Sequence, residues 1–339
     1  MFRIVNKLER VLLPQVKAGH IFFIDDGNVV SIEPLTYSKK YLFKIEQHKM
    51  YNLKFIDNHI FSLSNGILYI YDFLNKDVSE MDIGFTHLIS LTAKRLIGTR
   101  KVDGKRVVSV LNLESNHIEY SISTGLGNVL CSEQYIVHES FLNEALITNY
   151  SLFNGDLVSE IQLSSINEIP YTEPRFSSAS IIYKDCIIKS IPEGILASFD
   201  VFTGELQWYV EGVSLLVSEY KGKIYNLNTD TFVIIDASTG KIEKEISMLD
   251  QYRINKIEMA STNTLCVTDT HVFFTDNWKS KIGALNIEKC KLDWVYQLDT
   301  KQGTTLPNAP IIEEKRMYIL DSAGTLHILE KATTAKPSM

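Results

Sequence analysis

Several carboxylates in this chain have the residue type and the surroundings that acid–base chemistry would use. Asp25 and Asp26 end one apolar run, and Asp269 and Asp276 bracket another. Two such groups held roughly 5 to 10 Å apart would suit glycoside hydrolysis. Strand ends are also where hairpin turns form, and Asp is a common turn residue. Because nothing in the sequence brings two of these carboxylates together, a turn role is the simpler interpretation.

Histidines suggest a second kind of chemistry, which is metal binding. His20, His59 and His271 each stand directly before an apolar run, so one repeated structural position accounts for all three. The chain contains neither an HxH nor an HExxH motif, in which two imidazoles lie close enough to share a metal ion. We therefore predict no metal site and no cofactor.

The four cysteines lie far apart and form no CxxC pair. They are Cys131, Cys186, Cys266 and Cys290. We expect them to be small core or strand residues in a reducing compartment rather than metal ligands or disulfide partners. Lys7, Glu9 and Arg10 interrupt the stretch that would be apolar in a secretion signal, and no apolar run approaches the ~20 residues that span a bilayer. These features favour a cytoplasmic protein without membrane association.

The overall charge argues against a nucleic-acid partner. The 339 residues include 34 Lys and Arg against 41 Asp and Glu, which gives a formal net charge of −7. No stripe of basic residues interrupts this balance, so the electrostatic footprint of nucleic-acid binding is missing. The hydrophobic content of 45% is ordinary for a globular chain, and we expect a monomer.

The segment 222–247 shows what kind of element positions these residues. Its apolar runs at 224–227 and 232–235 are short and rich in β-branched and aromatic residues, which predicts strands. Asp236 then offers a side-chain acceptor to the backbone, and Gly240 can take a positive φ without steric cost. The chain is therefore predicted to reverse here into a third, solvent-facing strand.

Copies of this segment recur along the whole chain at intervals of 36 to 50 residues. In each copy, a side chain that accepts a hydrogen bond follows two apolar runs. These turn residues are Glu33, Asp72, Asn112, Ser151, Asp200, Asp236, Asn286 and Glu330. A period of about 40 to 45 residues built from four strands is typical of a β-propeller, in which each small sheet covers the next. The sequence therefore predicts an all-β fold of eight four-stranded blades.

The two ends of the chain are predicted to meet in the last blade. Residues 2–8 look like a strand without a preceding partner, whereas the last copy supplies only three strands before the polar tail 332–339. An N-terminal strand that joins the C-terminal blade would close the fold and remove exposed sheet edges. This arrangement predicts a single domain at residues 1–331. Seven blades is the alternative, if residues 1–20 add no strand to the last blade or if two short units merge.

Three long connections are predicted to lie on one face, where they would join the outer strand of one blade to the inner strand of the next. They cover residues 164–178, 248–262 and 299–310. Loops carry function more often than scaffold strands do, although tolerated insertions remain the alternative. Trp278 lies in a predicted hairpin turn, whereas Trp208 and Trp294 share a repeat position and are expected to pack between sheets. The candidate partner-binding residues are Tyr171, Glu173, Arg175, Trp278, Lys279, Lys301 and Gln302.

Three of the repeats resemble those of the pyrroloquinoline-quinone-like (PQQ-like) propellers. The segments DVFTGELQW, DASTGKIEKEI and NIEKCKLDWVY each match most or part of that family's pattern of an apolar residue, Asp, two residues, Thr-Gly-Lys, two residues and Trp. The resemblance is sharpest over 179–330, and it implies the propeller fold. The family includes quinone-dependent dehydrogenases and also proteins without a cofactor. The alcohol-oxidising members carry adjacent cysteines and calcium ligands, and this chain has no adjacent cysteines.

Because a propeller fold hosts many functions, the fold alone does not assign one. The sequence favours a non-catalytic interaction or scaffold protein that binds a protein partner through loops on one face. An immunity-type inhibitor is a specific form of that function. The alternative is an enzyme or small-ligand binder that uses the central channel, as a quinoprotein or propeller hydrolase would. We predict no catalytic residues, and whether the protein is an enzyme stays open.

Overall fold

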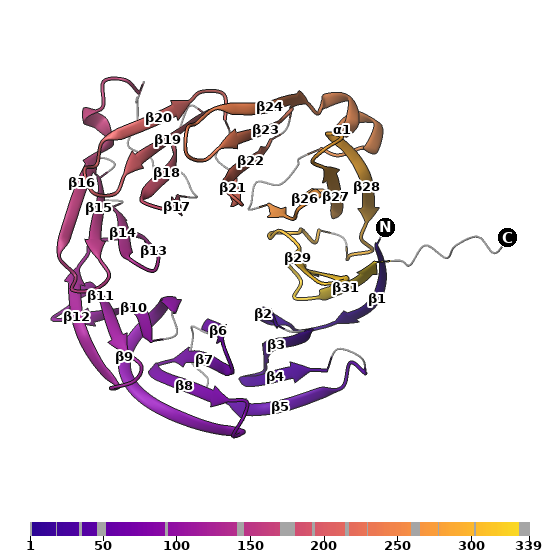
Figure 1. Cartoon of the computed structure of the whole chain (residues 1–339). Coiled ribbons are helices and arrows are strands. Elements are labelled where there is room, and N and C mark those ends of the chain that lie inside the picture. The colour runs from indigo at the N-terminus through magenta and orange to yellow at the C-terminus, as the bar shows by residue number, and fades with distance from the viewer. Residues whose placement is uncertain are drawn as a thin grey trace. The chain divides into compact units, whose positions relative to one another are not determined.

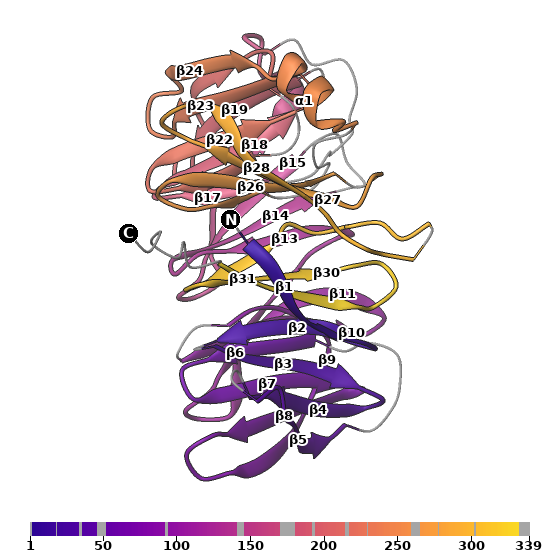
Figure 2. The ribbon, with the colours of Figure 1, turned by 90° about the vertical axis from the view of Figure 1, so that its right-hand side faces the viewer.

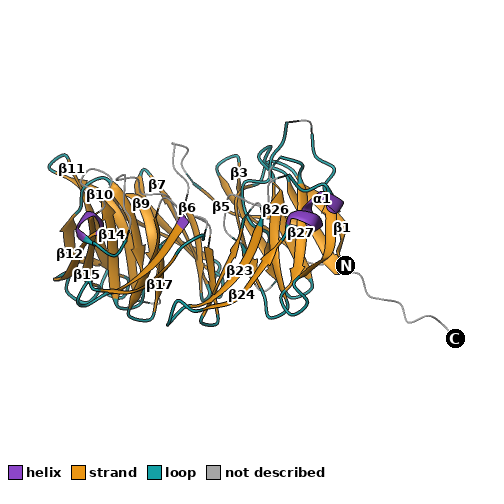
Figure 3. Cartoon of the chain, turned by 90° about the horizontal axis from the view of Figure 1, so that it is seen from above, coloured by secondary structure: helices purple, strands orange, loops and turns teal. Residues whose placement is uncertain are grey.

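Strands make up nearly all of the regular structure (Figure 3). The computed structural model describes the chain apart from residues 1, 18, 34–35, 46–51, 92–93, 141–145, 170–179, 192–193, 214–216, 229, 259–264, 277, 302 and 332–339. The described residues fall into two compact units, one formed by 1–25, 32–38 and 216–339, and the other by 26–31 and 39–215. The units are described separately below.

The first unit contains three complete four-stranded antiparallel sheets. One consists of β21 (Val217–Tyr220), β22 (Lys223–Leu227), β23 (Thr231–Asp236) and β24 (Ile242–Ser247). The next consists of β25 (Cys266–Val267), β26 (His271–Asp276), β27 (Lys281–Asn286) and β28 (Lys291–Gln297). The third has the order β1-β31-β30-β29, with bounds Phe2–Leu8, Leu326–Lys331, Arg316–Leu320 and Ile311–Glu313. A further sheet, which has strands in each unit, consists of β2 (Leu12–Lys17), β3 (His20–Asp25), β4 (Asn28–Ile32) and β5 (Lys39–Lys44).

The second unit contains a seven-stranded sheet and two four-stranded sheets (Figure 1). The long sheet consists of β6 (Asn52–Ile56), β7 (His59–Ser64), β8 (Gly66–Asp72), β9 (Asp77–Leu91), β10 (Arg95–Val102), β11 (Lys105–Asn112) and β12 (His117–Ser123). The second sheet consists of β13 (Gly127–Cys131), β14 (Tyr135–Ser140), β15 (Leu146–Ser151) and β16 (Leu157–Gln162). The third consists of β17 (Ile181–Tyr183), β18 (Cys186–Ile191), β19 (Ile195–Asp200) and β20 (Leu206–Val210). A short 3-10 turn, Leu163–Ser165, follows β16.

The predicted joining of the chain ends is confirmed. Strand β1 lies beside β31 and pairs with it antiparallel from Phe2↔Lys331 to Leu8↔Leu326 (Figure 2). Phe2 and Ile4 also pack against a buried cluster that includes Met317 and Leu329. Because β1 covers the free edge of β31, both hydrogen bonding and apolar burial hold the N-terminal strand in place.

Strand β9 continues from the repeat that contains Asp72 into the repeat that contains Asn112. It runs for 15 residues without a turn, pairing with β8 in its first part and with β10 in its last. Gly84 takes a φ of +62° within it, which bends the strand rather than reversing it. If β9 is counted in both halves, the described strands form eight four-stranded groups, consistent with eight predicted blades.

Seven of the eight predicted turns share one backbone geometry. In each, the residue four positions after the predicted acceptor takes a positive φ; these residues are Tyr37, Lys76, Asn116, Gly155, Gly204, Gly240 and Cys290. In the Asp236 turn, the carboxylate accepts the N–H groups of Ser238 and Thr239 at 3.1 and 2.9 Å. The same kind of side-chain acceptance occurs at Asp72, Asn112, Ser151, Asp200 and Asn286.

Glu33 and Glu330 depart from this pattern. The Glu33 carboxylate accepts the hydroxyl groups of Thr36 and Ser38 instead of backbone N–H groups. Glu330 lies inside β31, where Arg316 Nε is 3.4 Å from its carboxylate. The residues that would complete a turn after Glu330, 332–334, lie outside the described residues, so this turn stays a prediction. The fourth strand of its sheet is β1, which comes from the other end of the chain.

The connection that was expected as a loop at 248–262 begins with a helix, α1 (Leu249–Asn255). Met248 and Tyr252 are four residues apart, so both face inward, and the Tyr252 ring centroid lies 6.2 Å from that of Phe274. The helix ends where Lys256 takes a φ of +53°. Two turns of helix carry too little periodicity to stand out in the sequence.

Candidate functional site

Trp278 is held out into solvent by a turn whose backbone is fixed. Its side chain is 71% exposed. The backbone N–H of Trp278 donates to Oδ1 of the buried Asp276 at 3.1 Å, and the backbone N–H of Lys279 donates to the same oxygen at 3.2 Å. The Asp276 carboxylate therefore orders the turn between β26 and β27, as expected of a turn residue.

The end of α1 is tied to one side of this turn. The N–H of Glu258 donates to Asp276 Oδ2 at 2.8 Å, and Lys279 Nζ lies 2.9 Å from Glu258 Oε1. Lys281 Nζ donates to the carbonyl oxygens of Asn255 and Lys256 at 2.8 and 2.6 Å. These contacts place the segment 255–258 directly beside the Trp278 turn.

The segment 299–306 lies against the other side. The Thr300 hydroxyl donates to Ser280 Oγ at 3.0 Å, and that hydroxyl donates to the Thr304 carbonyl at 3.0 Å. Exposed Lys301 belongs to this segment, and its carbonyl accepts the N–H of Thr304 at 3.1 Å. We name α1 with 256–258, the turn 276–280 and the described part of 299–306 together the Trp278 surface.

The Trp278 surface brings together Trp278, Lys279 and Lys301 from the predicted partner-binding residues. The other four, Tyr171, Glu173, Arg175 and Gln302, lie outside the described residues. Sequence reasoning missed Leu249 and Ile254, which α1 exposes at 59% and 76%. Both are apolar residues that do not share the inward-facing side of α1 with Met248 and Tyr252. Their exposure can be inferred only once the helix is known. Apolar and charged side chains without a nucleophile suit binding rather than catalysis.

The shared position of the three histidines is confirmed. His20, His59 and His271 each begin a strand and lie against an aromatic ring two residues later, with centroids 5.8 to 6.1 Å apart. His271 also contacts Thr270 Oγ1 at 2.8 Å and Asp293 Oδ2 at 3.2 Å, on the wall of a 410 Å³ cavity. A hydroxyl, an imidazole and a carboxylate in this order match a nucleophilic triad, which would also need donors for an oxyanion. The packing on Phe273 matches that of the other two histidines, so the repeat explains this position of His271.

The remaining candidates for chemistry have structural partners. Asp26 lies in the turn after β3, and Asp269 accepts hydrogen bonds from Lys221 and from Tyr220, the latter at 3.0 Å. Burial raises the pKa of Cys131 to about 12 and that of Cys266 to about 11, so both thiols stay protonated at neutral pH. All four cysteines are free, and no three His, Cys, Asp or Glu side chains gather as metal ligands in the described part of the chain.

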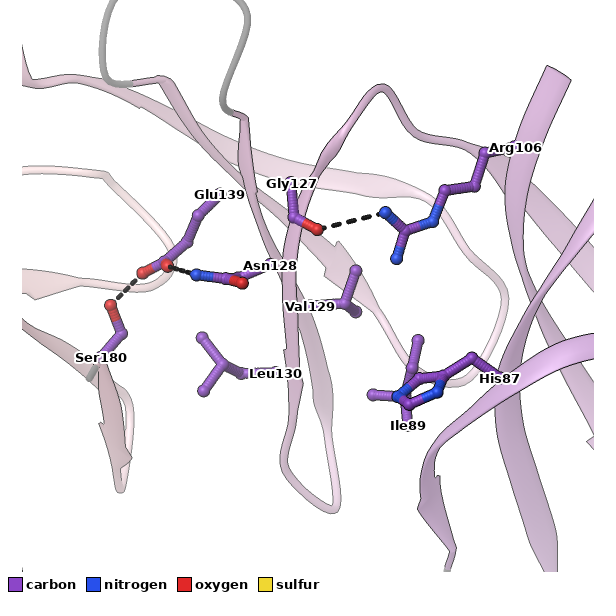
Figure 4. Close-up of a pocket in the computed structure, with 9 residues that line it drawn as sticks. All are labelled: His87, Ile89, Arg106, Gly127, Asn128, Val129, Leu130, Glu139 and Ser180. Atoms are coloured by element: carbon purple, nitrogen blue, oxygen red, sulfur yellow. Dashed lines mark hydrogen bonds between the residues drawn. The ribbon is translucent and has the colours of Figure 1, made fainter. Parts of the chain in front are cut away.

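A polar pocket of about 330 Å³ lies in the second unit (Figure 4). Strand β13 runs through it, with Glu139 and Ser180 on one side and Arg106 and His87 on the other (Figure 4). Lys189 Nζ lies 3.0 Å from Glu139 Oε1, and both side chains are only 1% exposed. We name this cavity the Arg106 pocket.

Known structures share the arrangement of these strands. BamB from Moraxella catarrhalis is similar with a TM-score of 0.66 and 12% identity, over 97% of this chain and 100% of that one. A europium-containing methanol dehydrogenase is similar with a TM-score of 0.64 and 10% identity, over 94% of this chain and 84% of that one. Sqt1 from Saccharomyces cerevisiae is similar with a TM-score of 0.63 and 10% identity, over 96% of this chain and 97% of that one.

The chain has the β-propeller fold. Identities of 10 to 12% show the propeller fold alone, so the PQQ-like resemblance of the repeats stays a prediction. No family model matches the sequence, and no curated protein matches it. No helix in the described part of the propeller has the length and apolar character of a membrane-spanning segment.

Proposed function

We propose that this propeller is a non-catalytic interaction protein that binds a protein partner through the Trp278 surface. The observation that carries the proposal is the Trp278 side chain, 71% exposed on a turn whose backbone is anchored on both sides. Tryptophan is enriched among residues that dominate binding energy at protein interfaces, and apolar side chains flanked by charged ones are typical of such sites. Leu249 and Ile254 add exposed apolar area on α1.

The anchoring of the turn favours tight binding. Gln297 Nε2 donates to the Lys279 carbonyl at 2.6 Å, and Asp276 fixes the other end of the turn. A surface that is already ordered loses little conformational entropy when a partner binds. Lys279, which pairs with Glu258, and the exposed Lys301 add polar side chains to the Trp278 surface, as is typical of the rim of an interface.

The proposal also covers the cellular location, the oligomeric state and the kinds of partner. We place the protein in the cytoplasm as a monomer that binds neither nucleic acid nor membrane, in agreement with its net charge of −7 and the composition of its sequence. Neutralisation of a toxin is the specific version we propose, because an inhibitor needs only to bind and cover its target.

Replacement of Trp278 by alanine tests this function. Trp278→Ala is expected to weaken partner binding by more than about tenfold, the loss typical of an interface hot spot, because the indole is the largest exposed apolar group of the surface. The melting temperature should stay unchanged, since the exposed indole adds little to folding. Partners captured from native-host extract by wild-type protein are identified by mass spectrometry, and their affinities are then measured by calorimetry.

Phe153→Ala is the matched control, because Phe153 is 63% exposed on a turn of the second unit. It should bind the partner as the wild type does. Equal affinities of Trp278→Ala and the wild type for every captured partner would contradict the proposal.

A further inference from the structure

The Arg106 pocket in the second unit contains a guanidinium, that of Arg106, whose charge no carboxylate of the described residues neutralises. Arg106 belongs to β11, and one of its Nη atoms donates to the Gly127 carbonyl at 3.3 Å. Among the residues that the structure describes, no carboxylate lies within ion-pair distance of this guanidinium. A guanidinium has five N–H donors, and this bond to Gly127 uses one of them, so donors remain for a ligand in the pocket.

The carboxylate that lines the pocket, that of Glu139, is already occupied. Glu139 Oε1 accepts Lys189 Nζ at 3.0 Å and also the hydroxyl of Ser180, and Asn128 Nδ2 lies 3.4 Å from Oε2. Strand β13 lies between this group and Arg106 (Figure 4). Because a buried carboxylate and its ammonium partner neutralise each other, Glu139 leaves the charge of Arg106 uncompensated.

The charge of Arg106 acts on two histidines near the pocket. Burial, followed by the charges of Arg106 and Lys54, lowers the pKa of His87. Burial also lowers the pKa of His138, which faces the same side of β13; the charge of Arg106 lowers it further, while that of Glu139 raises it. Nε2 of His138 is buried without a hydrogen-bond partner among the described residues, next to Gly127 on the pocket wall. An anion beside Arg106 would compensate the charges that disfavour imidazolium here.

We propose that the Arg106 pocket binds a small organic monoanion whose carboxylate is held by the Arg106 guanidinium. The planar fork of arginine matches a carboxylate with two parallel hydrogen bonds. Ile89 and Val129 provide apolar walls on the same side of β13, where a short aliphatic tail would pack (Figure 4). A cavity of about 330 Å³ is at the small end of the range found for ligand pockets. A single lining arginine suits one negative charge better than the two of a phosphate.

The Arg106 pocket shares no residue with the Trp278 surface. The proposed function does not require a small ligand, so a ligand in this pocket goes beyond it.

Calorimetric titration of the full chain with butyrate, and separately with inorganic phosphate, tests the proposed anion site. Butyrate is expected to bind one site and phosphate to bind at least tenfold more weakly. Parallel NMR titration of the histidines should show the pKa of His87 rising when butyrate is bound.

Variants locate the site. Arg106→Gln should weaken butyrate binding at least tenfold, and Arg106→Lys should weaken it less, because it keeps the charge and loses the fork. Arg100→Gln is the matched control: Arg100 lies on the neighbouring strand β10, bonds to Ser109 and Ser121, and should not affect binding. The proposal is overturned if folded wild-type protein binds no butyrate, if Arg106→Lys binds as the wild type does, or if phosphate binds as tightly as butyrate.

Discussion

The turn residues show how single positions shape this fold. The left-handed position is occupied by Gly155, Gly204 and Gly240 in three turns and by residues with side chains in the other four, among them Lys76 with a φ of +57°. A side chain in this conformation costs roughly 1 to 2 kcal/mol, whereas glycine adopts it freely. The repeated turn therefore keeps its positive φ at this position even where the residue disfavours that conformation.

Two substitutions at this position should change stability in opposite directions. Gly240→Ala is expected to lower the free energy of unfolding by about 1 kcal/mol, because alanine resists the φ of +70° that the turn requires. Lys76→Gly is expected to raise it by about 0.5 kcal/mol, since the relief of strain exceeds the added freedom of the unfolded chain. Urea denaturation measures both changes, and the same sign of change for the two variants would contradict this explanation.

Turn carboxylates should also make stability depend on pH. The Leu74 N–H lowers the pKa of Asp72, and the Thr239 hydroxyl lowers that of Asp236, from an ordinary value of 3.8. Because these pKa values are lower in the folded state, their stabilisation is present above about pH 4 and is lost as the pH falls through the folded values. Urea midpoints measured from pH 7 to pH 2.5 should therefore fall on the acid side. The double variant Asp72→Asn/Asp236→Asn should show a smaller fall, and an identical fall would count against the assignment.

At the scale of elements, structure that depends on neighbouring residues could be predicted from the sequence. Structure that depends on residues far apart in the sequence could not. The hairpins at 222–247 follow from β-branched runs and a turn whose donors lie two or three residues away. Whether the chain turns or continues at Gly84 depends on pairing with β8 and β10, which no local pattern records. Glu139 and Lys189 are 50 residues apart, so their buried ion pair, and with it the Arg106 pocket, had no signal in the sequence.

Strand β1 should be needed for the stability of its sheet. Deletion of residues 1–8 is expected to lower the free energy of unfolding on the order of 3 kcal/mol, because it uncovers the edge of β31 and the cluster around Phe2 and Ile4. Calorimetry and size-exclusion chromatography should show a lower melting temperature and increased self-association. A synthetic peptide of residues 2–8 should restore the melting temperature in part, by pairing with the same edge.

Removal of residues 332–339 is the control for this deletion, since these residues follow β31 and the sequence predicts a polar tail there. That variant should melt as the full chain does. If deletion of residues 1–8 also left melting unchanged, the pairing of β1 with β31 would be irrelevant to stability.

At the scale of the whole molecule, the repeated strands form the scaffold, and the proposed binding residues lie in segments that do not follow the repeat. Trp278 occupies a turn, α1 occupies a connection, and Lys301 occupies another, and none of these follows the repeat pattern. The same reasoning predicts that residues 1–331 unfold as a single domain, in one cooperative transition. Sequence reasoning named Trp278 and Lys301 but missed Ile254, because the connection that carries Ile254 was expected to be a loop and begins with the helix α1.

Hydrogen exchange of the protein with and without its captured partner tests the central claim most directly. The account predicts that backbone N–H groups in 249–258, 278–280 and 303–306 exchange more slowly in the complex, because the partner covers all three segments of the Trp278 surface. Unchanged exchange in these segments, with slowing confined to strands elsewhere in the propeller, would contradict it.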